Sequence, residues 1–517
     1  MTLVNTKYGK IQGYTENGVK IFKGIPYAEA PIGKLRFSPP VPNKHWNGIL
    51  KALEFGPCAY QGNTSDFVDD LKVYLDGEIY HYRPQKSEPE SEDCLNLNIW
   101  TPTTDNGKRP VMFWIHGGAF KTGTANMDIH DGSALAQYGD VVVVTINYRL
   151  GALGYLYIPG VTANAGQLDQ ILALEWVHDN IHLFGGDPNN VTIFGGSAGG
   201  YSVITLCAMP KVKGLFKRVI AQSAPLVDPK QDEKPTKTLM NKLGIKEGDI
   251  DALREIPVKE IIKVQDEISP GLDMGFIPQI DGETLPIHPL KAFRTGECKK
   301  IDLMMGTNLD EFTIFIAPDP FLSKINDEQS LIEILTKIGI EKEKIKNILK
   351  TYKKARKGKY SKEPKQLLNA ILTDIIFRIP TIRLLEDQSK YQPNTYNYLF
   401  TWPCPAFNKA LGAFHGLENI FIFNQLDNPE FKPIVGLKPN HDLSTKMMAA
   451  WTSFARNGNP NTDQLPQWPA YEINNPATMI FGEKIKVLNA VFDQGRAVWD
   501  ELKDFLKTFS TIQSQNQ

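Results

Sequence analysis

Apolar residues in the first half of the chain form short continuous runs that alternate with helical patterns. Residues 111–115 and 141–146 are rich in β-branched and aromatic side chains, as in strands that are buried on both faces. Between residues 168 and 181 the apolar positions recur at helical spacing, and a Gly-Gly-Asp-Pro turn at 185–188 ends that helix. This alternation predicts an α/β fold with a mostly parallel central sheet flanked by helices.

The second half of the chain is richer in amphipathic helices, which we expect at residues 330–352 and 443–455. No internal repeat, low-complexity tract or interdomain linker interrupts the sequence. The pattern therefore predicts one domain over residues 1–517, with large helical insertions around residues 225–287 and 315–410.

A predicted strand at 191–194 leads directly into a glycine-rich run at 195–200 that has Ser197 in its third position. A helical pattern follows from residue 201. Strand, sharp turn and helix in this order form a nucleophile elbow, in which strained backbone lifts a serine hydroxyl above the sheet. The N-terminus of the following helix also favours negative charge. Glycine-rich turns with serine are common, so it is this context that predicts Ser197 as a nucleophile.

A second glycine cluster, at residues 116–120, directly follows the predicted strand at 111–115. Hydrolases built on such sheets place their other oxyanion donors at this point. A simple glycine-rich loop is the alternative interpretation, but the cluster and Ser197 together favour an oxyanion hole.

A serine nucleophile needs a base, and three histidines follow Ser197 in the chain. His288 lies between prolines, and His441 begins an amphipathic helix, where a capping or surface role is sufficient. His415 lies in a loop of small residues at 412–416 that can present an imidazole in a cleft. Spacing alone gives equal weight to a catalytic and a structural role for His415.

The base in turn needs a carboxylate to orient it, and this fold places that acid between nucleophile and base in the chain. Asp310 and Glu311 follow a strand-like segment at 301–305 and a turn at 306–308. The carboxyl end of a strand is where such sheets build their sites. These residues by themselves do not favour one carboxylate over the other.

Composition narrows the classes of function. Of 517 residues, 42% are hydrophobic and 22% charged, which describes an ordinary folded protein and excludes a disordered or fibrous one. A formal net charge of -1 provides no field to attract nucleic acid. The apolar runs are far shorter than the roughly twenty residues of a membrane span. Five cysteines without a CxxC pattern or a Cys/His cluster offer no metal site, and no cofactor is expected.

The first residues lack the apolar core and cleavage site of a signal peptide. We therefore expect a cytoplasmic protein or, alternatively, a secreted one whose signal has been removed. The sequence does not predict an oligomeric state.

Further motifs occur in one order between about Tyr8 and Trp468. They include Ser-Glu-Asp-Cys-Leu at 91–95, Asn-Tyr-Arg at 147–149 and Phe-Gly-Gly-Asp-Pro at 184–188. With these motifs the chain resembles the type-B carboxylesterase and cholinesterase-like family of α/β-hydrolases. The other matching segments are 22–28, 35–37, 191–200, 451–455 and 458–461.

The resemblance implies a carboxylic ester hydrolase that acts on a small-molecule ester through an acyl-enzyme. It implies a Ser-Glu-His triad in which Glu311 is the acid and His415 the base. The oxyanion donors that it implies are the backbone N–H groups of Gly117, Gly118 and Ala198.

The resemblance also implies a possible disulfide between Cys58 and Cys94, which would not form in a reducing cytosol. Two departures from the family pattern bear on the substrate. Relatives commonly carry glutamate where this chain has Gly196, and the loop between the two cysteines lacks the tryptophan that binds quaternary ammonium in cholinesterases. Tyr80 or Tyr82 could partly replace that tryptophan.

These departures favour neutral carboxylic esters over choline esters. Two alternatives stay open. The first is a non-catalytic binding, adhesion or storage protein on the same fold, although such proteins often lack the serine. The second is a true cholinesterase.

Overall fold

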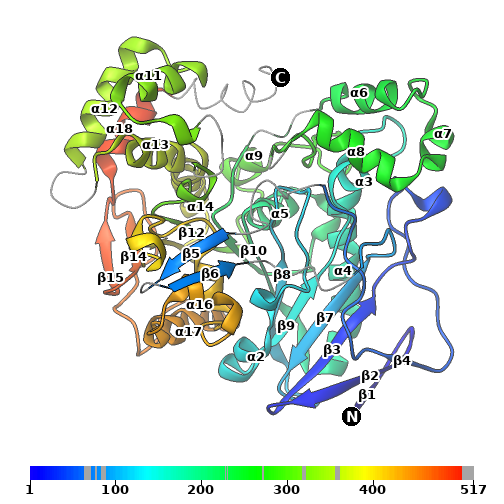
Figure 1. The fold of residues 1–517 in the computed structure, drawn as a ribbon. Coiled ribbons are helices and arrows are strands. Elements are labelled where there is room, and N and C mark those ends of the chain that lie inside the picture. Colours follow the sequence, from blue (N-terminus) through cyan, green and yellow to red (C-terminus); the bar gives the residue numbers. More distant parts are fainter. Residues whose placement is uncertain are drawn as a thin grey trace.

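One large twisted sheet runs through the molecule and carries helices on both sides (Figure 1). The structure is a computed structural model that describes residues 1–62, 71–75, 78–82, 89–227, 229, 231–270, 273–316, 322–355 and 361–502. Within these residues the sheet has 13 strands, and a separate hairpin adds two more. The predicted α/β fold is therefore confirmed.

The centre of the sheet is parallel and its edges are antiparallel. The strand order is β1-β2-β3-β7-β9-β8-β10-β11-β12-β13-β14-β15, and β4 pairs with β2. All neighbours from β9 to β14 are parallel. The strands are β1 Thr2–Thr6, β2 Gly9–Glu16, β3 Val19–Pro26, β4 Ile49–Lys51, β7 Asn96–Thr101, β8 Arg109–Ile115, β9 Val142–Ile146, β10 Gly186–Gly196, β11 Arg218–Gln222, β12 Asp302–Asn308, β13 Thr395–Phe400, β14 Ala477–Phe481 and β15 Lys486–Asn489, with β5 Leu71–Leu75 and β6 Glu78–Tyr82 in the hairpin.

Side chains of the central strands alternate between two apolar clusters, one on each face of the sheet. In β8, Val111 and Phe113 belong to one cluster, and Met112 and Trp114 belong to the other. This alternation is the two-residue period of an extended chain, and both faces are apolar because both are covered by helices. Helices α4 and α5 cover the first face, and α2 and α17 cover the second.

The helices follow the apolar periods of the sequence. The pattern at 168–181 becomes α4, and the pattern at 443–455 becomes α17. The helices are α2 Ser133–Gly139, α3 Gly151–Tyr155, α4 Ala165–Asn180, α5 Ala198–Leu206, α6 Lys234–Lys242, α7 Ile250–Glu255, α8 Val258–Ile268, α9 Pro289–Arg294, α10 Thr313–Ile316, α11 Glu328–Lys337, α12 Lys342–Ala355, α13 Pro364–Thr373, α14 Ile379–Ser389, α15 Glu418–Ile422, α16 Lys432–Val435, α17 His441–Asn457 and α18 Asp493–Glu501. Among the described residues, no helix is both long and apolar enough to cross a membrane.

A third apolar cluster joins α11, α12, α13 and α18 beside the β14–β15 edge of the sheet (Figure 1). The single helix predicted at 330–352 was wrong, because α11 ends at Lys337 and α12 begins at Lys342. Gly339 lies between them with a φ of 95°, a left-handed conformation that glycine adopts without strain. The turn predicted at 306–308 was also wrong, since β12 continues to Asn308 and pairs with β13 there.

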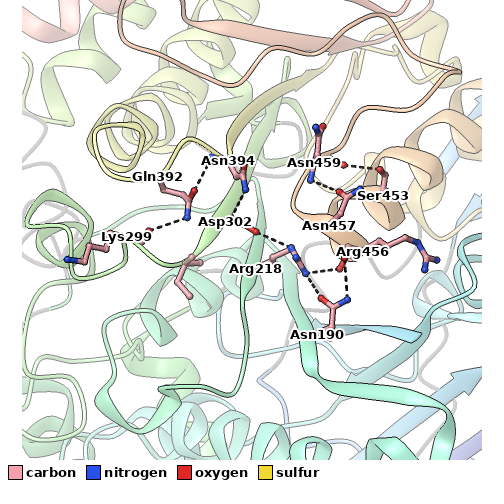
Figure 2. Close-up of polar contacts among 12 residues, drawn as sticks. Asn190, Arg218, Lys299, Asp302, Gln392, Asn394, Ser453, Arg456, Asn457 and Asn459 are labelled. Atoms are coloured by element: carbon pink, nitrogen blue, oxygen red, sulfur yellow. Dashed lines mark hydrogen bonds and ion pairs between the residues drawn. The ribbon is translucent and has the colours of Figure 1, made fainter. Parts of the chain in front are cut away.

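A buried ion pair ties three strands together at the end of the sheet that lies away from Ser197. Arg218 is the first residue of β11, and its Nε donates to Asp302 Oδ2, in the first residue of β12, at 3.1 Å. Its Nη1 donates to the side chain of Asn190 in β10 and to the carbonyl of Ala455 in α17 (Figure 2). The two charged side chains are only 11% and 15% exposed. Arg218 therefore links β10, β11, β12 and α17.

We predict that Arg218→Met lowers the free energy of unfolding by about 2 to 4 kcal/mol, because it leaves the half-buried Asp302 carboxylate without its cation. Thermal and urea unfolding followed by circular dichroism would measure the change. The control is Lys237→Met, which removes an exposed pair with Glu233 and should leave the free energy of unfolding nearly unchanged, because solvent screens an exposed ion pair. Equal losses in both variants would contradict the importance of the buried pair.

Candidate active site

Ser197 occupies a strained turn between β10 and α5. Its φ of 57° and ψ of -124° lie where a residue with a side chain is rarely found. The turn is held by the Ser197 N–H, which donates to the Gln222 carbonyl at 2.9 Å, and by the Ser197 carbonyl, which accepts from the Tyr201 N–H at 2.9 Å. The backbone is therefore clamped between β11 and α5 while the serine side chain stays partly exposed.

Glycine is required on the helical side of this turn because backbone passes close to backbone. A Cβ on Gly199 would lie 2.0 Å from the Ile115 carbonyl oxygen at the end of β8. A Cβ on Gly195 would lie 2.5 Å from the carbonyl carbon of Gly199. Gly196 differs, since its nearest neighbours, in Asn419 and Trp114, would be 3.4 Å away. Gly195 and Gly199 are thus structural, whereas position 196 has room for a small side chain.

The second glycine cluster lies against the serine turn. A Cβ on Gly117 would come within 2.7 Å of the Gly196 carbonyl oxygen and 3.0 Å of Ser197 Cβ. The N–H groups of Gly117 and Gly118 donate to no acceptor among the described residues. Ala198 is the first residue of α5, where a helical N–H has no partner within the helix. The three N–H groups that the resemblance implies as oxyanion donors therefore come from the loop after β8, which lies against Ser197 at Gly117, and from the start of α5.

Buried groups hold the loop at residues 116–118 in place. The hydroxyl of Tyr148 donates to the His116 carbonyl at 2.8 Å, and its ring stacks on the His116 imidazole. The His116 Nδ1 lies 2.8 Å from the Gly117 carbonyl oxygen. Burial lowers the pKa of His116 to about 4, so this imidazole is neutral at pH 7. The loop is therefore fixed without an added positive charge.

Glu311 and His415 form a hydrogen-bonded pair although 104 residues separate them in sequence. His415 Nδ1 lies 2.6 Å from Glu311 Oε2, and the Glu311 side chain is fully buried. The other oxygen, Oε1, accepts the backbone N–H of Asn308 at 2.7 Å. Burial alone would lower the pKa of His415, but the charge of Glu311 and its hydrogen bond outweigh this effect and raise that pKa.

The other candidates from the sequence have different partners. Asp310 Oδ2 accepts the N–H of Ala413, and its Oδ1 accepts from the Asn369 amide, so Asp310 fastens the loop that carries His415. His288 caps α9 by accepting the Leu290 N–H. The imidazole of the exposed residue His441, at the start of α17, lies 3.4 Å from Asp427. The structure therefore brings only His415, of these three histidines, to a buried carboxylate.

Side chains that the sequence did not single out link the serine and histidine segments. The Gln222 amide donates to Asn419 Oδ1 at 2.8 Å, and Gln222 also accepts from Trp451 Nε1 at 3.0 Å. The backbone carbonyl of Gln222 also accepts the Ser197 N–H. Asn419 lies four residues after His415 in the sequence. This Gln222–Asn419 link joins the end of β11, which holds the Ser197 N–H, to the helix that follows His415.

Aromatic rings surround the His415 imidazole. Phe315 and Phe377 lie with ring centroids 5.3 Å and 5.0 Å from it. Phe377 is buried, and Phe315 is partly exposed. These rings reduce the access of water to the Glu311–His415 pair, which strengthens its electrostatic interaction.

Cys58 and Cys94 are both buried. Burial first, and then the charge of Asp169, raise the pKa of the Cys94 thiol, and Cys58 adds a smaller contribution. The disulfide between them stays a prediction. Tyr80 and Tyr82 belong to a stretch whose side chains lie outside the described residues. In the described parts of the chain, no three His, Cys, Asp or Glu side chains gather as metal ligands would.

Comparison with known proteins places this geometry in context. The family model described as "Carboxylesterase family" matches residues 1–499. A para-nitrobenzyl esterase from Bacillus subtilis is 36% identical over 503 residues, which cover 94% of this chain and 96% of the relative. A phenmedipham hydrolase from Pseudarthrobacter oxydans is 34% identical over 495 residues, covering 93% and 95% of the two chains.

A solved structure shows the same similarity in three dimensions. A carboxylesterase from Geobacillus stearothermophilus superimposes with a TM-score of 0.83 at 36% identity. The superposition covers 96% of this chain and 100% of that one.

We predict that Gly199→Ala and Gly196→Ala have different effects on stability and on the reactivity of Ser197. Gly199→Ala should lower the free energy of unfolding by about 2 to 3 kcal/mol, since its Cβ would overlap the β8 backbone. It should also abolish labelling of Ser197 by a fluorophosphonate. Gly196→Ala should cost less than about 1 kcal/mol and keep the labelling. Thermal unfolding and mass spectrometry of the labelled peptide would test both, and equal behaviour of the variants would show that the close backbone contact is unimportant.

Proposed function

This chain belongs to the carboxylesterase family, and from that premise we propose that it cleaves neutral carboxylic esters through an acyl-enzyme on Ser197. The family, the relatives and the structural neighbours show a serine carboxylesterase. The roles of the individual residues are our proposal. The observation that carries it is the 2.6 Å contact between His415 and the buried Glu311, in a chain whose candidate serine occupies a strained turn.

In the first step, His415 Nε2 takes the proton from Ser197 Oγ as that oxygen forms a bond to the ester carbonyl carbon. The carbonyl π electrons move to its oxygen, which becomes an oxyanion. The N–H groups of Gly117, Gly118 and Ala198 donate to that oxyanion. Their fixed positions stabilise the charge as it develops, because no reorganisation is needed at that moment.

The tetrahedral intermediate then collapses. The bond to the alkoxy oxygen breaks, and the imidazolium of His415 gives its proton to that oxygen, so a neutral alcohol leaves. Water attacks the acyl-enzyme by the same route, with His415 as its base. The second collapse releases the carboxylic acid and returns the proton to Ser197.

Glu311 supports both steps by orienting His415 and stabilising its imidazolium. The hydrogen bond from His415 Nδ1–H fixes the tautomer that leaves Nε2 free to accept a proton. The raised pKa of His415 reflects the same attraction. Because His415 must be neutral to act as a base, activity should fall as pH drops through that raised pKa.

Features near the serine support a neutral, apolar substrate. Position 196 adds no charge beside Ser197, and the rings of Phe315 and Phe377 lie around the base. A relative is named as a para-nitrobenzyl esterase. We therefore extend the proposal to esters with an aromatic group. A choline ester is a less suitable substrate, because the loop between Cys58 and Cys94 contains no tryptophan to bind its quaternary ammonium group.

A non-catalytic binding, adhesion or storage protein is the alternative from another class. It would keep the fold while Ser197 stays unreactive. The strained serine turn and the buried acid paired with the histidine argue against it, because such strain costs stability and is usually kept for function.

We predict that Ser197→Ala lowers hydrolysis of a para-nitrophenyl ester by at least about a thousandfold, because the variant lacks the attacking oxygen. Steady-state kinetics would measure this loss. A fluorophosphonate should add one equivalent to the unsubstituted protein, on Ser197, and none to the variant. Full activity in the variant, or no adduct on folded unsubstituted protein, would overturn the assignment.

The substrate prediction compares charged and neutral esters of equal size. A para-nitrobenzyl ester should be cleaved with a larger kcat/KM than butyrylcholine, and butyrylcholine should show no advantage over its uncharged dimethylbutyl analogue. A cholinesterase would show a strong preference for the cation. Initial rates with the three esters on the same enzyme preparation decide between these outcomes.

A further inference from the structure

A second buried carboxyl group lies behind the Glu311–His415 pair. Glu418 is the first residue of α15, and its side chain has no exposed surface. Glu418 Oε2 accepts from the Asn308 amide nitrogen at 2.5 Å, whereas Oε1 has no hydrogen-bond partner among the described residues. A buried carboxyl with one oxygen unpaired is costly to ionise.

Asn308 connects the two carboxyl groups directly. Its backbone N–H donates to Glu311, and its side-chain amide donates both to Glu418 and to the Phe414 carbonyl at 2.7 Å. Asn308 is the last residue of β12. One residue at the end of a central strand therefore holds the acid, the second carboxyl and the loop that precedes His415.

The groups around Glu418 come from several elements. β12 and the turn after it contribute an amide and a carboxylate, β13 contributes a buried phenol, and the loop before α15 contributes an imidazole. These side chains are Asn308, Glu311, Tyr398 and His415. Helix α17 packs on α15, and its Ser444 hydroxyl donates to the Phe421 carbonyl of α15 at 2.7 Å.

The electrostatics of this group link the protonation of Glu418 to that of His415. Burial first, and then the charge of Glu311, raise the pKa of Glu418 to about 7. The charge of Glu418 in turn contributes to the raised pKa of His415. The two groups are therefore coupled, because the protonation state of each one changes the pKa of the other.

We propose that Glu418 is a positioning residue whose ionisation tunes the basicity of His415, so that the site becomes most active when Glu418 has lost its proton. This inference rests on the proposed role of His415 as base. At low pH, Glu418 is neutral and Glu311 alone attracts the imidazolium. At higher pH, Glu418 adds a second negative charge, which stabilises the imidazolium that forms in the transition state.

The test uses Glu418→Gln, which keeps an oxygen for the Asn308 amide but removes the charge. The acid limb of the kcat/KM profile for a para-nitrophenyl ester should move down by about half to one pH unit. The rate above pH 8 should fall by roughly fivefold to tenfold, with little change in KM, because the lost charge acts on the transition state. A purely structural role would lower the rate equally at all pH values and leave the limb in place.

The control is Glu483→Gln, the same change in a side chain that is 69% exposed and pairs with Lys409. Its profile should match that of the unsubstituted enzyme, because solvent screens an exposed charge. An unmoved limb in folded Glu418→Gln would overturn the proposal.

A second measurement does not depend on the variant folding. In the unsubstituted protein with 13C-labelled histidine, the His415 signal, assigned by its loss in His415→Asn, should titrate in two coupled steps. A single step would contradict the coupling. Fluorophosphonate labelling of Ser197 separates this proposal from the proposed function. Normal labelling with an unmoved limb rejects only the role of Glu418, whereas absent labelling rejects the catalytic role of Ser197.

Discussion

The contact between Gly199 and the end of β8 is the constraint on which the site depends. Because the Gly199 backbone lies against the Ile115 carbonyl, α5 can begin directly above the sheet, and Ser197 is forced into its left-handed turn. The same contact brings the end of β8 beside the end of β10. The segment after β8 therefore arrives next to the serine with the N–H groups of Gly117 and Gly118 available. One close approach creates both the strained serine turn and the place that we propose for an oxyanion.

The Glu311–His415 pair is assembled by a different route, through the loop between β13 and α15. Asp310 holds this loop through the Ala413 N–H, Asn308 holds it through the Phe414 carbonyl, and Asn419 ties it to Gln222 below the serine. These contacts are polar and buried, so their geometry is specific and a misplaced partner would leave a polar group unsatisfied. The buried charges of Glu311 and Glu418 are therefore part of the positioning of His415.

The two ends of the central strands contribute differently, one to stability and the other to the candidate site. At one end, Arg218 and Asp302 join the first residues of β11 and β12 and contribute to stability. At the other, Gln222 and Asn308 end the same two strands and support the site. Parallel strands allow this division, because all their carboxyl ends meet at one edge, where loops can vary without disturbing the sheet.

Local pattern was sufficient to predict the parallel sheet, the helices α4 and α17, and Ser197 as the nucleophile candidate. Each rests on short-range physics: apolar periods of two or about 3.6 residues, and a turn whose strain requires neighbouring glycines. The break between α11 and α12 was also a local signal, at Gly339, but the amphipathic pattern on both sides obscured it.

Local physics did not distinguish Asp310 from Glu311, because both follow the same strand; the family resemblance implied Glu311, and the tertiary structure supplies the physical difference between them. The approach of the 412–419 loop places Asp310 on a backbone N–H and Glu311 on His415. It also revealed Gln222, Asn419 and Glu418, whose partners lie about a hundred or more residues away in sequence. The sequence does not predict which distant group a polar side chain will contact. Its burial and its charged neighbours are defined only after the strands and loops have packed.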